Sequence, residues 1–118
     1  MSEFVVLLHE DPGVFARLSP AEMQQVLQKY RAWFEKLGAT GKMQVSKKLT
    51  DEGGRQLRGK RGSIVVSDGP FAEAKDVVAG LFIVQAASYD EARSLLNDCP
   101  HFDYDGWIEL RQIDSMGK

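Results

Sequence analysis

Metal-binding and disulfide-forming side chains are scarce in this sequence of 118 residues, which holds one cysteine and two histidines. The lone thiol, Cys99, cannot form a disulfide within the chain, and no CxxC pair or histidine cluster offers the usual ligands of zinc. The chain also lacks the GxxxxGK[ST] pattern of a phosphate-binding loop. We therefore predict no metal and no cofactor. An unpaired thiol also suits a reducing compartment, which favours a cytoplasmic protein.

Long apolar runs and an excess of positive charge are absent as well. The apolar run at residues 4–8 is too short for a membrane span or a signal-peptide core, and the acidic Glu3 precedes it. The formal net charge is −2, whereas binding to DNA or to an anionic membrane needs a clustered positive surface. We accordingly predict no direct nucleic-acid partner and no membrane association.

The composition that is present, 43% apolar and 27% charged, is typical of a globular protein, and the length fits one domain over residues 1–118. The clearest element is a helix. Ser19 is placed to be its N-cap, Pro20 its first residue and Glu22 the partner in an S-x-x-E capping box. A wide apolar stripe at helical spacing follows, and Gly38 stands where a glycine commonly ends a helix.

Three aromatic residues of this stripe, Tyr30, Trp33 and Phe34, admit two interpretations. Aromatic stripes at helical spacing usually pack against a sheet, and this is the interpretation that we favour. The alternative is that they line a ligand pocket.

The remaining pattern predicts strands on both sides of a second helix. Alternating or continuous apolar runs indicate strands at residues 4–9, 42–49, 63–67, 77–86 and 107–113. The stretch 50–62 is basic and rich in glycine, which is typical of an exposed hairpin or flexible loop, although an anion site is an alternative. The second helix begins after Ser88 and is stopped by Pro100, which places Cys99 on its apolar face as a buried structural residue.

The order of elements is therefore β-α-β-β-β-α-β, which indicates an α+β, ferredoxin-like sandwich with two helices on one face of a sheet. The strand at 77–86 carries apolar residues on both of its faces, so the face without helices needs a cover. We predict a homodimer packed sheet to sheet.

Chemistry-bearing side chains gather in the connector S-D-G-P-F-A-E-A-K at residues 67–75. Asp68 is able to form a simple Asx turn, which is the commoner role of an aspartate before Gly-Pro. Alternatively, His101 is able to pair with Asp68, or with Asp103 or Asp105. A histidine beside a carboxylate is the usual arrangement for general acid–base catalysis. An isolated exposed histidine is more often inert, so the residues alone leave both interpretations open.

This connector resembles the DGPFAE-x-K signature of the DGPF group in the YCII-related family. The resemblance extends to D-E-A at 90–92, C-P-H at 99–101, G-W-I-E-L-R at 106–111 and L-S-P-A-E at 18–22, and thus covers essentially the whole chain. It implies a bacterial protein that forms a dimeric α/β barrel from ferredoxin-like protomers.

The resemblance also implies a function. YCII-like proteins are associated with a histidine–aspartate pair. The DGPF group keeps instead an aspartate and the histidine of the C-P-H motif, which are Asp68 and His101 here. We expect a small-molecule pocket near the connector, with His101 as general acid–base and Asp68 as the group that orients it or as a second acid–base group. The expected ligand-binding set is Gly69, Pro70, Phe71, Glu73, Lys75 and Arg111. The ligand would be a small polar metabolite. Relatives occur beside or fused to extracytoplasmic-function sigma factors, so the alternative is a ligand-sensing or regulatory module without catalysis, and a third interpretation is that the connector only seals a dimer interface.

Overall fold

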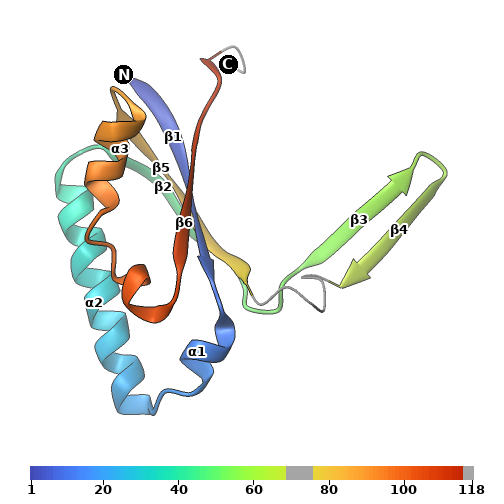
Figure 1. Cartoon of the computed structure of the whole chain (residues 1–118), viewed down its shortest axis with the longest axis horizontal. Coiled ribbons are helices and arrows are strands. Elements are labelled where there is room, and N and C mark those ends of the chain that lie inside the picture. The colour runs from blue at the N-terminus through green and yellow to red at the C-terminus, as the bar shows by residue number, and fades with distance from the viewer. Residues whose placement is uncertain (69–75, 116–118) are drawn as a thin grey trace.

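The computed structural model describes residues 1–68 and 76–115. Six strands, three α-helices and one 3₁₀ helix lie in these ranges (Figure 1). In chain order they are β1 (Ser2–Glu10), α1 (Pro12–Ala16), α2 (Pro20–Ala39), β2 (Met43–Lys48), β3 (Arg55–Lys60), β4 (Ser63–Asp68), β5 (Val77–Ala86), α3 (Tyr89–Leu96), η1 (Pro100–Tyr104) and β6 (Trp107–Gln112).

Four of the strands form one sheet in the order β2-β5-β1-β6, and every neighbouring pair is antiparallel. The connection from β1 through α2 to β2 skips one strand position, which β5 fills. The connection from β5 through α3 to β6 likewise skips the position of β1. This is the split β-α-β connectivity expected from the sequence. The α+β class with antiparallel sheets is confirmed.

The core lies between this sheet and the helices. Alternate residues of β1 and β5 point toward the helices and are fully buried, among them Phe4, Val6, Phe82 and Val84. Trp33 of α2 packs against them, with its ring centroid 6.0 Å from that of Phe82. The residues between them in sequence, such as Ile83, remain partly exposed on the face without helices. Period-two alternation thus separates a packed face from an open one.

Helix α2 begins as the sequence predicts. The Ser19 hydroxyl accepts a hydrogen bond from the Glu22 backbone N–H, and the Glu22 carboxylate accepts one from the Ser19 N–H. Its end was predicted wrongly, because Gly38 lies within the helix, which continues to Ala39. Thr40 caps this end through its N–H and its hydroxyl, both of which donate to the Leu37 carbonyl.

Two other helix boundaries also differ from the expectation. The short helix α1 lies between the strand predicted at residues 4–9 and the helix predicted after Ser19, where no helix was expected, and its N-cap Asp11 accepts a hydrogen bond from the Gly13 N–H. Helix α3 ends at Leu96 rather than continuing to Cys99, and Pro100 begins the 3₁₀ helix η1. Proline is favoured at the first position of a helix because its missing N–H would have no partner there.

Strands β3 and β4 form a separate two-stranded hairpin that projects from the body of the molecule (Figure 1). We call residues 55–68 the arm. The radius of gyration is 16.3 Å, whereas a compact chain of this length has about 13.5 Å. The stretch 50–62 was expected to be an exposed hairpin or a flexible loop. It supplies only the first strand of the hairpin, β3, and the second, β4, is the strand predicted at residues 63–67.

Candidate functional site

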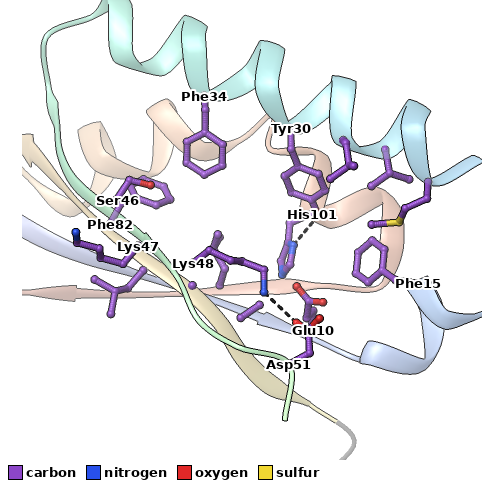
Figure 2. Close-up of a pocket in the computed structure, with 17 residues that line it drawn as sticks. Glu10, Phe15, Tyr30, Phe34, Ser46, Lys47, Lys48, Asp51, Phe82 and His101 are labelled. Carbon is purple, nitrogen blue, oxygen red and sulfur yellow. Dashed lines mark hydrogen bonds and ion pairs between the residues drawn. The ribbon is translucent and has the colours of Figure 1, made fainter. Parts of the chain in front are cut away.

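A pocket of about 290 Å³ lies between α2 and the helix-facing side of the sheet. Its wall is mainly apolar, with three phenylalanines drawn from three different elements: Phe15 of α1, Phe34 of α2 and Phe82 of β5 (Figure 2). Polar side chains gather mainly at the end and mouth of the pocket; they are Glu10, Tyr30, Ser46, Lys47, Lys48, Asp51 and His101. Such a lining, apolar with a few polar groups, is the usual character of a small-molecule site.

His101 is the buried polar residue at the end of this pocket, with only 1% of its surface exposed. Its Nε2 contacts the backbone carbonyl of His9, and its Nδ1 lies 2.8 Å from the hydroxyl of Tyr30. Because a carbonyl only accepts hydrogen bonds, Nε2 carries the ring hydrogen. In the neutral ring Nδ1 is then the acceptor, so the Tyr30 hydroxyl donates to it.

The local sequence fixes the His101 ring in this position. Pro100 starts the turn of 3₁₀ helix that carries His101, and Asp105 ends it in the left-handed conformation with φ 59°. The chain then returns at Gly106, whose N–H donates to the His101 carbonyl. A Cβ atom at Gly106 would lie 2.6 Å from His101 Nε2, so only glycine leaves room for the ring.

Burial keeps both members of the Tyr30–His101 pair uncharged. Desolvation lowers the pKa of His101, although its bond to the His9 carbonyl acts in the opposite direction. Desolvation also raises the pKa of Tyr30 well above its ordinary value of 10.0. At neutral pH the pair is therefore a tyrosine hydroxyl that donates a hydrogen bond to a neutral imidazole. Along this bond a proton is able to move from the Tyr30 oxygen to His101 Nδ1.

A second titratable group, Glu10 at the end of β1, faces the pocket (Figure 2). Burial raises the pKa of this carboxyl, while the positive charge of Lys48 acts against the rise. Lys48 itself is held at the mouth, where its Nζ lies 2.9 Å from Asp51 Oδ1 and donates to the Leu49 carbonyl. The pocket thus offers a carboxyl group with a raised pKa and one nearby ammonium group.

The other histidine, His9, contributes its backbone to the pocket but directs its side chain elsewhere. Its imidazole stacks on Trp107, with ring centroids 3.8 Å apart, and its Nε2 lies 3.0 Å from Glu109 Oε1. Within the described chain, the pocket lining includes neither the His9 ring nor Glu109.

The residues predicted from the sequence are only partly brought together. His101 lines the pocket, but Asp68 lies at the exposed end of β4, where its Oδ1 is 3.2 Å from Arg55 Nε. Arg111 lies on β6, 3.8 Å from the Glu109 carboxylate. Among residues 1–68 and 76–115, the lining contains neither Asp68 nor Arg111. The predicted residues Gly69, Pro70, Phe71, Glu73 and Lys75 lie outside the described residues, and all these roles remain predictions.

Sequence reasoning favoured a purely structural role for Tyr30, and it missed five other polar residues of the pocket, which are Glu10, Ser46, Lys47, Lys48 and Asp51. The aromatic stripe was the one signal available. Trp33 is a core residue as expected, whereas Tyr30 and Phe34 line the pocket. Cys99 is buried as predicted, and desolvation raises the pKa of its thiol to about 11, which makes it a poor nucleophile at neutral pH.

Neither a metal site nor a membrane helix is found in the part of the chain that the structure describes. No group of three or more histidine, cysteine, aspartate or glutamate side chains there is arranged to hold a metal ion. None of the described helices is both long and apolar enough to cross a membrane.

Comparison with known proteins gives three findings. A family model, the YCII-related domain, matches residues 2–116. An uncharacterised protein of Rhizobium meliloti (strain 1021) is 31% identical over 96 residues, which cover 80% of this chain and 77% of that protein. A solved structure of 5-chloro-2-hydroxyhydroquinone dehydrochlorinase from Burkholderia phenoliruptrix AC1100, in complex with 2,5-dihydroxybenzoquinone, is 20% identical. It superposes with a TM-score of 0.48 over 91% of this chain and 90% of that chain.

Proposed function

The chain belongs to the YCII-related domain family, and from that premise we propose that it binds a small molecule in the pocket under α2 and transfers a proton to or from it. The observation that carries this proposal is the hydrogen bond between Tyr30 and His101 at the end of an apolar pocket. A buried tyrosine–imidazole pair with a fixed tautomer is the most directly usable acid–base group in the described chain.

The pair acts as a relay. A hydroxyl group of the bound ligand gives its proton to the Tyr30 oxygen while Tyr30 gives its own proton to His101 Nδ1. The products are a ligand oxyanion and an imidazolium, and the Nε2–H of the imidazolium stays bonded to the His9 carbonyl. A hydrogen bond to the charged form favours that form, so this carbonyl offsets part of the cost of a buried positive charge.

The lining indicates the kind of ligand. A volume of about 290 Å³ lies just below the usual range for ligand pockets, about 300–1,000 Å³, and therefore suits a small ligand. Phe15, Phe34 and Phe82 suit a flat apolar body, and the polar end suits one hydroxyl group. The sequence led to the expectation of a small polar metabolite; we now propose a small, mainly apolar molecule with one ionisable oxygen, such as a phenol or an enol.

Asp68 keeps its proposed role as a second acid–base group, and Glu73, Lys75 and Arg111 keep theirs as ligand-positioning residues. We also retain the sheet-to-sheet homodimer and the barrel that it would form. Support for the dimer comes from the open face of the sheet, which presents partly exposed aliphatic side chains from β1 and β5. Cytoplasmic location and the sigma-factor partner remain predictions.

The second candidate function is ligand sensing without catalysis. It is favoured by the apolar character of most of the lining, because such a pocket binds a ligand without needing to move a proton. In that case substitution of Tyr30 or His101 changes ligand affinity, and the bound ligand leaves chemically unchanged.

Binding of 4-nitrophenol provides the test, because this probe combines a flat ring with an ionisable hydroxyl and reports its own ionisation by absorbance. We expect the wild-type protein to bind it and to increase its ionised fraction. Tyr30→Phe is expected to abolish the increase in ionisation, because the oxygen that receives the proton is gone.

The matched control is Tyr89→Phe, which removes a hydroxyl that accepts a hydrogen bond from the Gln112 N–H outside the pocket. Unchanged binding and ionisation in this control are expected. Equal behaviour of wild type and Tyr30→Phe would overturn the relay, and a change confined to Asp68→Asn would favour the pair predicted from the sequence.

A further inference from the structure

The arm leaves an apolar surface in water. All residues of β3 and β4 except Gln56 are exposed, and Leu57, Ile64 and Val66 are 65%, 57% and 60% accessible. A two-stranded hairpin is marginally stable in water by itself. An arm of this composition therefore needs a surface to pack against.

The arm has two different faces. Leu57 lies opposite Val66 in the register and Ile64 lies two residues from Val66, so these three side chains share one face. Val65 lies opposite Arg58 on the other face. The arm is therefore amphipathic, and only one of its faces is predominantly aliphatic.

A groove on the body has the matching character. It measures about 450 Å³ and is lined by Arg93 and Leu96 of α3, Phe102 of η1, and Ile108 and Leu110 of β6. Phe102 is 52% exposed. We call this the β6–α3 groove. Five of its eight lining residues are aliphatic or aromatic, which suits the apolar face of the arm, and the other three are Asp90, Arg93 and Asn97.

The edge of the sheet beside this groove has free backbone positions. β6 is an outermost strand and, within the described residues, pairs only with β1. The Gln112 N–H points outward, since it donates to the Tyr89 hydroxyl. Backbone groups alternate in direction along a strand, so those of Ile108 and Leu110 point outward as well. Addition of a strand to such an edge is a common mode of association.

From these features we propose that the arm docks on a second copy of this chain, with β4 added to the β6 edge and Ile64 and Val66 packed in the β6–α3 groove. The occupant is a second copy because the arm follows β2, which lies at the opposite edge of the sheet from β6. The arm of one chain is therefore on the wrong side of the sheet to reach its own β6 edge. The arm also projects away from its own body (Figure 1). Two arms and two grooves close a symmetric pair.

The charges of arm and body complement each other. Residues 55–68 contain four basic side chains and one acid, a formal charge of +3. Because the whole chain carries −2, the remaining residues carry −5. Asp90 lines the groove and Asp103 follows Phe102, although Arg93 lines it too. Opposite charges of this kind steer association and fix its orientation.

Cysteine cross-linking between differently labelled chains tests the proposal. Val66→Cys and Phe102→Cys proteins are prepared separately with different tags, mixed and oxidised, and the disulfide-linked heterodimer is measured. The native Cys99 is buried, so it does not compete. We expect the heterodimer to be the main cross-linked product. Val65→Cys mixed with Phe102→Cys is the matched control and is expected to give little, since Val65 lies on the other face of the arm.

Sedimentation velocity supplies the second measurement. Ile64→Lys with Val66→Lys is expected to weaken self-association at least about tenfold, whereas Val65→Lys leaves it nearly unchanged. These side chains are exposed, so a loss of folding does not explain the difference. A monomeric wild-type protein, equal cross-linking from Val65 and Val66, or a dimer unaffected by the double substitution would each overturn the proposal. Ionisation of 4-nitrophenol by the pocket is measured separately and does not depend on this result.

Discussion

Replacing Gly106 with alanine is expected to displace the His101 ring and to destabilise the protein. The added Cβ would lie 2.6 Å from Nε2 and 2.7 Å from Cγ of a ring that is almost fully buried. The ring has little freedom to yield, because Tyr30 holds one nitrogen and the His9 carbonyl holds the other.

The magnitude follows from two costs. Overpacking a well-packed site costs about 1–3 kcal/mol, and each buried polar group left without its partner costs about 1–3 kcal/mol. We expect Gly106→Ala to lower the free energy of unfolding by about 2–4 kcal/mol, since the neighbours relax in part. Chemical denaturation measures this directly, and the melting temperature should fall by about 3–5 °C for each kcal/mol.

Gly38→Ala is the matched control. Gly38 lies inside α2, and a Cβ there would meet only the Met43 Cε at 3.7 Å. Alanine is the better helix former by about 1 kcal/mol, so this variant is expected to be unchanged or more stable. A second comparison places Gly106→Ala in a His101→Ala background, where the space is free and the cost should fall below about 1 kcal/mol. An equal cost in both backgrounds would refute the reasoning.

Two further predictions concern pH and helix capping. Burial lowers the pKa of His101 below 6.5, so the unfolded chain binds a proton that the folded chain does not. Stability should therefore decline as pH falls below about 6.5, by up to about 1.4 kcal/mol per pH unit. His101→Asn should remove this part of the slope, and identical slopes in the two proteins would contradict it. Ser19→Ala removes the acceptor of the Glu22 N–H, and chemical denaturation is expected to show a free energy of unfolding lower by about 1 kcal/mol. Ser19→Asn can still cap the helix and should lose much less stability. Equal losses of stability in both variants would contradict the capping role.

Local chemistry explains why much of the fold follows from the sequence. The capping box at Ser19 and Glu22 uses residues three positions apart, so its geometry is set before any tertiary contact forms. The apolar runs of β1 and β5 likewise predict buried strands, but both strands carry apolar residues on either face, so the sequence does not record which face packs against the helices. The end of α2 was missed because Thr40 supplies the cap that Gly38 was expected to supply, and a threonine gives a weaker signal in the sequence than a glycine.

The site depends on contacts that no local pattern records. Tyr30 and His101 are 71 positions apart in the chain, and they meet because η1 brings His101 under α2. The C-P-H motif predicts His101 as a functional residue, but the partners predicted for it were the aspartates Asp68, Asp103 and Asp105. Asp68 instead pairs with Arg55 on the arm. A tyrosine on an apolar stripe has the same sequence signature whether it packs in a core or lines a pocket.

The proposed function is tested most directly by finding whether a ligand binds next to the Tyr30–His101 pair. Long-range ¹H–¹⁵N spectra of the His101 side chain, recorded at neutral pH while 4-nitrophenol is added, report both the tautomer and the contact. We predict a neutral ring with its hydrogen on Nε2 in the free protein, and a shift of the Nδ1 resonance on binding that disappears in Tyr30→Phe. A hydrogen on Nδ1 in the free protein, or binding that leaves the His101 nitrogens unchanged, would contradict the proposed site.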